Sequence, residues 1–192
     1  MINLSQFDEA EIVAKHFGSF VGHFVDIGAG NGVALSNTFQ LGLAGWRGLL
    51  VEASPTSFAE LVDNYANRGY IHLVNAALWT ERKLMRFHYN PTYYSSLIEQ
   101  DVPGRYDAHY WVQTVTAVHL AAIQPECDFC SVDIEGADIL VFPSLIAAYP
   151  NCQLWCVEHG NKPLLRIDWK EMFDKYGLKI VADTPENYIC AP

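Results

Sequence analysis

The sequence predicts one α/β domain over residues 1–192, with a doubly wound, mostly parallel sheet and a terminal antiparallel hairpin. Three observations predict this fold. Short apolar runs alternate with stretches of helical spacing. The early runs are apolar on both faces, which is typical of parallel strands covered by helices on each side. A glycine-dense turn follows the first run, and the length of 192 residues suits a single domain with its own core.

The first half of the chain contains three strand-like runs separated by helical stretches. The second helix begins with Pro55, a residue that suits the first helical turn, and ends near Gly69, where a C-cap glycine would stand. The expected strands are 22–28, 45–53 and 70–78, and the expected helices are 31–43 and 55–69.

The middle of the chain, residues 79–118, is less regular. Residues 83–89 and 111–118 have the β-branched or alternating character of strands, and residues 90–110 read as an extended loop between them. An irregular segment this long inside a compact domain usually serves a site.

The regular alternation resumes after residue 126. We expect the chain to close in a hairpin that turns at Thr184 and Pro185. The remaining elements are a strand at 127–134, a helix at 137–150 interrupted near Pro143, a strand at 152–160, a helix at 162–177 and the hairpin at 178–190.

Composition and charge limit the classes of partner. The formal charge of −10 and the lack of a Lys/Arg run argue against nucleic acid, and they favour a neutral or cationic small ligand. No apolar run approaches the roughly 20 residues that span a bilayer, and the acidic N-terminus differs from a signal peptide. We therefore expect a cytoplasmic protein with no membrane partner, and the sequence leaves its oligomeric state open.

Five cysteines raise the question of a metal site or disulfides. Cys127 and Cys130 fall in a strand-like run, where residues three apart point to opposite faces, so they should not share a zinc ion. Cys152 and Cys156 would share a face of the next strand but lie too far apart to bond to each other. The expected state is buried, reduced thiols.

The glycine turn after the first strand reads VDIGAGNG, and its three glycines allow a sharp bend and close approach to a ligand. In open α/β sheets this turn is the usual ligand contact. A dinucleotide fingerprint would need Gly or Ala where this chain has Val33, and no Gly-Lys-Ser/Thr follows as in a phosphate-binding loop.

Two acids accompany the turn. Glu52 ends the second strand, where a carboxylate can accept both hydrogen bonds of a ribose diol. Asp26 precedes the turn and would repel a pyrophosphate, so a cationic sulfonium with an amino-acid tail suits the turn better. The ligand expected from these residues is an adenosyl sulfonium.

Several motifs along the chain, in order and spacing, resemble the FkbM family of S-adenosylmethionine-dependent methyltransferases. The family likeness implies a seven-stranded Rossmann-like methyltransferase sheet. A departure is Ser131, because a lysine is frequent there in the family. The motifs are VDIGAGNG, SNTFQLGLAGWRGLLVEASPTSF, NAALWTE, YSSL, VQTVTAVHLAAI and SVDIEGADILVF, with LSQFDEAEIV as a leader and NYIC as the closing strand.

The resemblance implies S-adenosyl-L-methionine as cofactor and a role for each matching position. Asp26 would orient the amino group of the methionine portion or the turn itself, and Glu52 would take the ribose hydroxyls. Ala53 and Asp133 are also expected to contact the cofactor. Gly28, Gly30 and Asn31 would line the methionine portion, and Asn75 and Ala76 would flank the adenine.

Candidates for catalysis stand at the ends of two later strands. Asp133 and Glu158 would end neighbouring parallel strands, so their carboxylates could converge, and His159 follows directly. These residues could act as a general base or hold a divalent metal ion that acidifies a hydroxyl. The alternative is that Asp133 and Glu135 cap the following helix and that His159 is a turn residue. Glu135 is assigned to the helix start.

The sequence therefore predicts a methyltransferase that methylates a hydroxyl of a small acceptor, a sugar or a related molecule. Residues 93–97, YYSSL, either lean over the ligand or form an exposed loop. Two alternatives stay open: an inactive adenosyl-binding scaffold and an NAD-dependent oxidoreductase.

Overall fold

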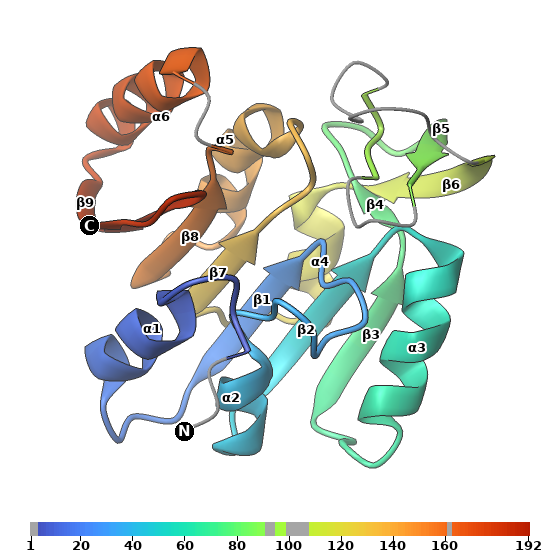
Figure 1. Ribbon diagram of the computed structural model, residues 1–192, viewed down its shortest axis with the longest axis horizontal. Helices are drawn as coiled ribbons and strands as arrows, with labels where there is room; N and C mark the ends of the chain where they lie inside the picture. Colours follow the sequence, from blue (N-terminus) through green and yellow to red (C-terminus); the bar gives the residue numbers. More distant parts are fainter. Residues whose placement is uncertain (1–3, 91–94, 99–107, 161–162) are drawn as a thin grey trace.

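The computed structural model describes residues 4–90, 95–98, 108–160 and 163–192. The helices are α1 (Glu9–Phe17), α2 (Phe39–Leu43), α3 (Pro55–Tyr65), α4 (Ala117–Ile123), α5 (Asp138–Ala148) and α6 (Pro163–Tyr176). The strands are β1 (His23–Ile27), β2 (Arg47–Glu52), β3 (Ile71–Asn75), β4 (Ala77–Leu78), β5 (Leu84–Tyr89), β6 (Ala108–Val115), β7 (Phe129–Val132), β8 (Leu154–Glu158), β9 (Lys179–Asp183) and β10 (Asn187–Ala191). Helices and strands alternate from α1 to β3 and from β6 to β9, and the strands β3 to β6 follow one another between these two parts (Figure 1).

The main sheet has seven strands in the order β3-β2-β1-β7-β8-β10-β9. The first five of these are parallel, and β10 runs antiparallel to both β8 and β9. The strand order reverses between β1 and β7, which is where ligands bind in open α/β sheets. The predicted doubly wound sheet and its terminal hairpin are confirmed.

Alternating side chains of the parallel strands separate two apolar clusters. Val25 and Leu49 point to the cluster that also contains residues of α4, α5 and α6. Phe24 and Leu50 point to the cluster that contains residues of α1, α2 and α3. Helices therefore cover both faces, which explains why the central strands carry apolar residues on both faces.

A second, three-stranded sheet in the order β4-β6-β5 lies at the carboxyl ends of the main strands (Figure 1). The expected strand 70–78 divides into β3 and β4, and β4 pairs with β6 instead of continuing in the main sheet. The expected strand 111–118 begins earlier, at Ala108, and ends at Val115, where the unexpected helix α4 follows.

The expected helix 31–43 is wrong over most of its length, because only Phe39–Leu43 is helical. The Asn31 side-chain oxygen accepts hydrogen bonds from the backbone N–H groups of Val33 and Ala34, at 3.0 and 2.9 Å. Such local bonds compete with a helix. Leu35 also has φ of +57°, a left-handed conformation outside any right-handed helix.

Helix α1 occupies the N-terminal stretch that resembles the family's leader. Its Glu9 is fully buried, and its carboxylate accepts hydrogen bonds from Thr184 Oγ1 at 2.6 Å and Asn187 Nδ2 at 3.1 Å. A buried carboxylate needs such partners. The contact fastens the beginning of the chain to the β9–β10 turn.

All five cysteines are buried free thiols, as expected, but the expected placement of Cys127 relative to Cys130, and of Cys152 relative to Cys156, is wrong. Strand β7 begins only at Phe129, so Cys127 lies before it and packs in the same apolar cluster as Cys130. Cys152 precedes β8 and joins that cluster, whereas Cys156 lies in the cluster on the other face.

Candidate functional site

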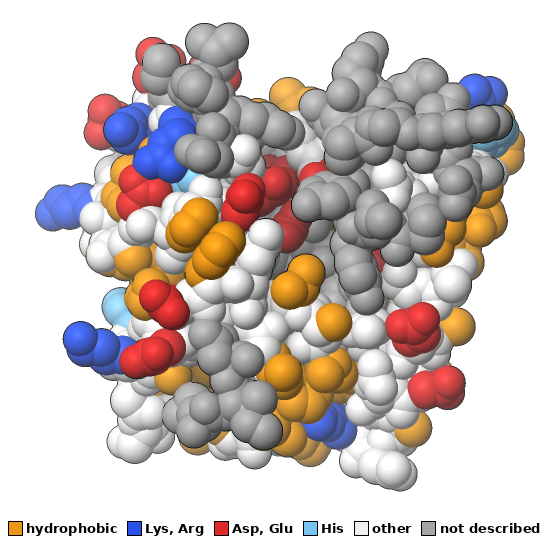
Figure 2. All heavy atoms as spheres, in the orientation of Figure 1, with side chains coloured by type: hydrophobic (Ala, Val, Ile, Leu, Met, Phe, Trp, Pro, Cys, Tyr) orange, Lys and Arg blue, Asp and Glu red, His pale blue; other side chains and the backbone are white. Residues whose placement is uncertain are grey.

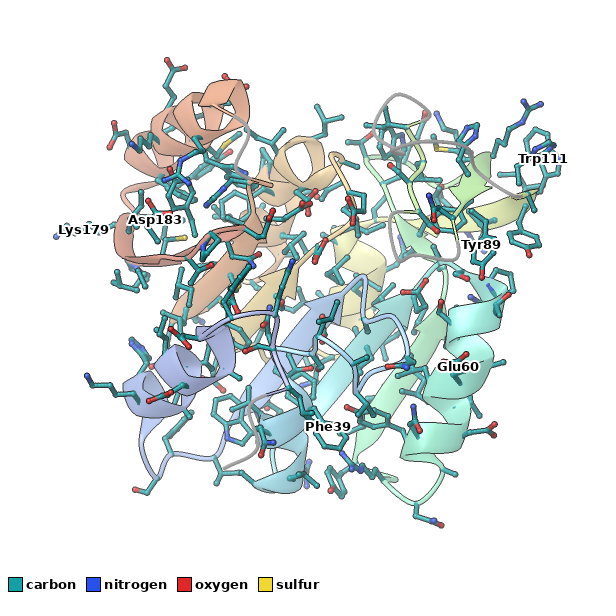
Figure 3. The ribbon with its side chains drawn as sticks, in the orientation of Figure 1. Phe39, Glu60, Tyr89, Trp111, Lys179 and Asp183 are labelled. Carbon is teal, nitrogen blue, oxygen red and sulfur yellow. The ribbon has the colours of Figure 1, made fainter. Side chains whose placement is uncertain are left out.

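A cavity of about 250 Å³ lies at the carboxyl ends of β1, β2, β7 and β8, under the second sheet. The glycine turn after β1 forms its floor, and Phe87, Tyr89 and Leu97 belong to its upper wall. Figure 3 labels Glu60 of α3 and Tyr89 of β5, both of which line it. Figure 2 shows acidic side chains gathered at the centre of this face.

The three glycines of the turn all have positive φ but meet different surroundings. A Cβ on Gly28 would lie 1.7 Å from the carbonyl oxygen of Asp133, so this glycine lets β1 and β7 come together. A Cβ on Gly32 would lie 2.4 Å from Leu61, so this one lets α3 pack close. A Cβ on Gly30 would meet nothing within 4 Å. Gly30 lines the cavity and exposes bare backbone to it.

Glu52 connects the glycine turn to the end of β2. Its carboxylate accepts hydrogen bonds from Gly30 N at 2.8 Å and Ser54 N at 2.6 Å. Burial raises the pKa of Glu52 to about 7, although these two bonds lower it. Each carboxylate oxygen can accept more than one hydrogen bond, so Glu52 can still receive a hydroxyl from the cavity.

Asp26 lies beneath the turn and is 5% exposed. Its Oδ2 accepts a 2.6 Å hydrogen bond from Thr38 Oγ1. Burial raises the pKa of Asp26 to about 7, and the charge of Asp133 adds to the rise. Ser131, at the position where a lysine is frequent in the family, accepts a hydrogen bond from Asn37 Nδ2 at 3.1 Å, and both residues line the cavity.

Ala53 and Ala76 also line the cavity, as expected for neighbours of an adenosyl group. Asn31 and Asn75 fall outside the lining. Asn31 makes the turn contacts already described, and Asn75 Nδ2 donates to the Glu52 carbonyl at 2.8 Å. The direct cofactor contacts of these two asparagines stay predictions.

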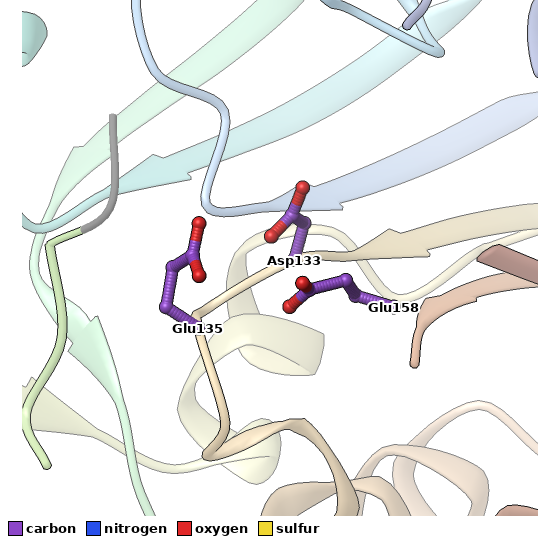
Figure 4. A group of neighbouring side chains, drawn as sticks. All are labelled: Asp133, Glu135 and Glu158. Atoms are coloured by element: carbon purple, nitrogen blue, oxygen red, sulfur yellow. The ribbon is translucent and has the colours of Figure 1, made fainter. Parts of the chain in front are cut away.

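Three carboxylates converge at the ends of β7 and β8 (Figure 4). Asp133, Glu135 and Glu158 each offer an oxygen, and these oxygens lie within 4.8 Å of one another. The expected convergence of Asp133 with Glu158 is present. Burial raises the pKa of Asp133 above its ordinary value, and the charges of Glu186 and Glu9 add to the rise.

His159 does not join this group. Its ring is fully buried, and it lies 3.1 Å from Arg166 Nη1 and 3.4 Å from Asp183 Oδ1, outside the cavity lining. Burial, followed by the charge of Arg166, lowers the pKa of His159. The third member of the group is Glu135, which was expected at the helix start, and not the expected His159.

The loop that carries Asp133 and Glu135 is held from two sides. Asp138 accepts hydrogen bonds from Ile134 N at 2.9 Å and Gly136 N at 3.0 Å, so its carboxylate holds the loop itself. The N-cap residue of α5 is Ala137, so neither Asp133 nor Glu135 occupies the capping position. Ser96 Oγ donates to the Glu135 carbonyl at 2.8 Å. Glu135 has φ of +56°, which costs a non-glycine residue about 1–2 kcal/mol and is common at functional sites.

The YYSSL segment is described only in part. Tyr93 and Tyr94 lie outside the described residues. Ser95 and Leu97 line the cavity. Ser96 is 1% exposed and contacts the loop that carries Asp133 and Glu135, the acid loop. This portion of the motif therefore lies over the cavity.

The charge of the lining is one-sided. It contains no Lys, Arg or His among the described residues. Three of its acids, Glu60, Glu135 and Glu186, had no place in the site expected from the sequence. Glu60 lies within α3, Glu135 stands three residues beyond the end of β7, and Glu186 belongs to a distant hairpin. The acidic residues of the lining are Asp26, Glu52, Glu60, Asp133, Glu135, Glu158 and Glu186.

Residues 26–176 match the family model described as the methyltransferase FkbM domain. The chain belongs to the FkbM methyltransferase family. The predicted relationship is therefore confirmed, and the protein is an S-adenosylmethionine-dependent methyltransferase. A comparison with curated proteins gives no match.

Solved structures show the same fold at low sequence identity. Fibrillarin of Aeropyrum pernix, in complex with natively bound S-adenosyl-L-methionine, is 12% identical, with a TM-score of 0.57 and coverage of 98% of this chain and 74% of that one. A Pyrococcus horikoshii protein described as an RNA methyltransferase is 14% identical, with a TM-score of 0.56 and coverage of 96% and 82%. A precorrin-6y C5,15-methyltransferase of Geobacter metallireducens is 12% identical, with a TM-score of 0.54 and coverage of 99% and 90%.

The family match leaves the NAD-dependent alternative without support. Among the described residues, the helices are too short or too polar to cross a membrane.

Proposed function

We propose that this FkbM methyltransferase transfers a methyl group to a hydroxyl of a neutral small molecule, a sugar or a related compound. The observation that carries the proposal is the Asp133 carboxylate, which lines the cavity beside the glycine turn, lies close to Glu135 and Glu158, and has a raised pKa. A general base works best when its pKa is close to the working pH. The proposal includes a cytoplasmic location and a single domain.

The floor of the cavity fits S-adenosyl-L-methionine, which supplies an electrophilic methyl group when bound. Gly30 leaves open space where any other residue would place a side chain. Glu52 would accept hydrogen bonds from the ribose hydroxyls, and Asp26 would favour a cationic group above the turn. Ala53 and Ala76 are small enough to leave room for the adenine.

Asp133 would accept the proton of the acceptor hydroxyl. In a methyl transfer, most of the rate comes from holding the reacting groups in line, which contributes up to about 7–11 kcal/mol in well-oriented systems. The second sheet and the neighbouring Leu97 would hold the acceptor, because Phe87, Tyr89 and Leu97 present apolar and aromatic surface opposite the acids. Such surface suits the apolar faces of a sugar ring.

The charge of the lining supports a neutral acceptor over a polyanion. RNA is the acceptor named for one solved structure of the same fold, but that description belongs to that protein. Here seven carboxylates line the cavity, and the described lining offers no cation to a phosphate. The negative charge of the lining therefore favours an acceptor that is uncharged or cationic.

A second possible mechanism at the same place uses a divalent cation to activate the acceptor hydroxyl. Asp133, Glu135 and Glu158 provide three oxygen ligands within reach of one ion, whereas His159 does not. Mg²⁺ and related ions bind through carboxylates and keep several waters, and one could acidify the hydroxyl. Turnover that survives complete removal of metal by a chelator would leave only direct proton transfer to Asp133.

A methyl-transfer assay against a panel of methyl glycosides tests the proposal. The wild-type chain should methylate at least one glycoside, and Asp133→Asn should lower kcat at least 100-fold while S-adenosylhomocysteine still binds. Glu171→Gln, an exposed acid on α6, is the matched control and should keep wild-type activity. Binding of S-adenosyl-L-methionine without transfer to any glycoside would favour the inactive scaffold.

A further inference from the structure

Two cysteine thiols face each other at the amino ends of β7 and β8, at the opposite edge of the sheet from the cofactor cavity. Cys127 Sγ and Cys152 Sγ lie 3.8 Å apart. The backbone N–H groups of Gln153 and Leu154 both donate to the Asp128 carbonyl, at 3.0 and 3.1 Å. These bonds hold the two cysteine-bearing segments side by side.

A second cavity, of about 280 Å³, gives small solutes access to this pair. Cys127, Tyr149 and His23 belong to its lining. Cys127 is 7% exposed and Cys152 is 2% exposed. Cys127 is therefore the thiol that a solute reaches first.

The hydroxyl of Tyr149 is buried and has no hydrogen-bond partner among the described residues. Its pKa is raised by burial first, and then by the nearby thiols of Cys130, Cys127 and Cys152. An unused buried donor is costly, at about 1–3 kcal/mol. Beside these sulfurs it can donate to an oxygen or a negative charge formed on one of them.

We propose that Cys127 and Cys152 form a redox site that a peroxide converts from dithiol to disulfide. Cys127 sulfur attacks the peroxide, its S–H proton leaves with the departing hydroxide as water, and a sulfenic acid remains. Cys152 sulfur then attacks this sulfur, the S–S bond forms, the S–O bond breaks, and the Cys152 proton leaves with hydroxide as a second water. The two thiols are oxidised by two electrons in all, and the peroxide is reduced.

The geometry favours this pair over its neighbours. A disulfide bond of about 2.0 Å needs each sulfur to move by only about 1 Å from the present separation. Both cysteines stand before their strands, where the backbone is free of the sheet's ladder. Cys130 and Cys190 lie inside strands and are fully buried, so they have neither the access nor the freedom.

Burial also sets the rate. It raises the pKa of both thiols well above the ordinary value, so the reactive thiolate is scarce at neutral pH. The rate should rise about tenfold per pH unit between pH 7 and 9, because the thiolate fraction grows in that proportion below the pKa. The bond would close residues 127–152, which include the acid loop and α5, and a cross-link of this length stabilises a fold.

The test treats the folded wild-type chain with hydrogen peroxide at pH 7 and pH 8.5, blocks remaining thiols by alkylation, and measures intact mass and linked peptides. The expected result is the loss of two hydrogens, a Cys127–Cys152 link and full reversal by dithiothreitol. The melting temperature should rise by about 5 °C or more on oxidation. Cys127→Ala and Cys152→Ala should prevent the link, and Cys156→Ala, on the other face of the sheet, should leave it intact.

Peptide mapping of the wild-type chain decides the question even if a variant fails to fold. A link to Cys130 or Cys190, a sulfinic acid on Cys127 without any link, or no oxidation at either pH would each overturn the proposal. An equal rate at the two pH values would contradict the thiolate step.

Discussion

At the scale of single residues, the turn glycines look alike in the sequence but have different tasks. Gly28 faces the Asp133 carbonyl, at a distance that leaves no room for a side chain. Gly30 has the same left-handed backbone but open space around it. The sequence predicts that glycine is needed in this turn, and only the structure separates close strand packing from access for a ligand.

Alanine substitutions at these two glycines test the distinction. Gly28→Ala should lower the free energy of unfolding by at least about 3 kcal/mol, because the new Cβ pushes β1 and β7 apart. Gly30→Ala should cost about 1–2 kcal/mol for its left-handed φ and should weaken binding of S-adenosyl-L-methionine. Urea unfolding and calorimetric titration measure the two effects. Equal losses of stability would show that the contact with Asp133 is not what requires Gly28.

Asp26 makes stability depend on pH in an unusual direction. Its pKa rises from 3.8 to about 7 on folding, so the folded chain keeps a proton that the unfolded chain releases between these values. Its contribution to the free energy of unfolding is therefore lost as pH rises from about 4 to about 7. Asp26→Asn removes this effect. The free energy of unfolding of the variant, relative to that of the wild type, should therefore rise by about 3–4 kcal/mol as the pH increases from about 4 to about 7.

Urea unfolding at pH 4.5, 6 and 7.5 measures this gain. Asp174→Asn, an exposed acid on α6, is the control and should show no such trend. A constant difference between Asp26→Asn and the wild type across the three pH values would refute the raised pKa.

At the scale of elements, the second sheet is coupled through Ser96 to the carboxyl edge of the main sheet, where Asp133 and Glu135 lie. Its hydroxyl donates to the Glu135 carbonyl and also accepts a 3.0 Å hydrogen bond from Ile98 N. Ser96 also exchanges backbone hydrogen bonds with His88 of β5. The positions of Glu135, whose φ is positive, and of the acids beside it therefore depend on a segment that is anchored to β5.

Ser96→Ala should thus disturb catalysis more than folding. Removing the hydroxyl leaves the Glu135 carbonyl without this donor and should cost about 1–3 kcal/mol of stability. Methyl transfer to the best glycoside should fall several-fold, with binding of S-adenosylhomocysteine unchanged. Ser144→Ala is the matched control, because Ser144 Oγ also donates to a backbone carbonyl, at 2.7 Å, but within α5. Equal loss of activity in both variants would exclude a positioning role for Ser96.

The elements also show where sequence periodicity fails. The apolar spacing of residues 31–43 is helical, yet the side chain of Asn31 bonds locally and the helix is postponed to Phe39. Strand β4 belongs to a different sheet from β3, although the apolar run is continuous, because β4 pairs with a partner nearly 40 residues later in the chain. Local patterns carry no information on such distant partners.

At the scale of the whole molecule, strand order was the predictable part of the site. Glycine and acid at the ends of successive parallel strands must meet at one edge of the sheet, which brought Asp26, Glu52, Asp133 and Glu158 to one cavity. His159 was misplaced because the residue after a strand end can turn either toward the cavity or behind it. Glu186 reaches the cavity through the antiparallel return of β10, which no short motif reveals.

The sum of these acids predicts how the enzyme discriminates between acceptors. Seven carboxylates line the cavity, and at an effective dielectric constant of about 20 a phosphate about 7 Å from one of them is repelled by about 2 kcal/mol. A methyl glycoside should therefore exceed its 6-phosphate in kcat/KM by at least about 30-fold, and a short oligoribonucleotide should not be methylated.

Glu186→Gln should lower this ratio of kcat/KM values several-fold, because it removes one charge from the lining. Glu171→Gln removes the same charge from the exposed face of α6 and should leave the ratio unchanged. Steady-state kinetics with the three acceptors measure these ratios, and a phosphorylated acceptor used as well as the neutral one would mean that the lining charge does not select the substrate.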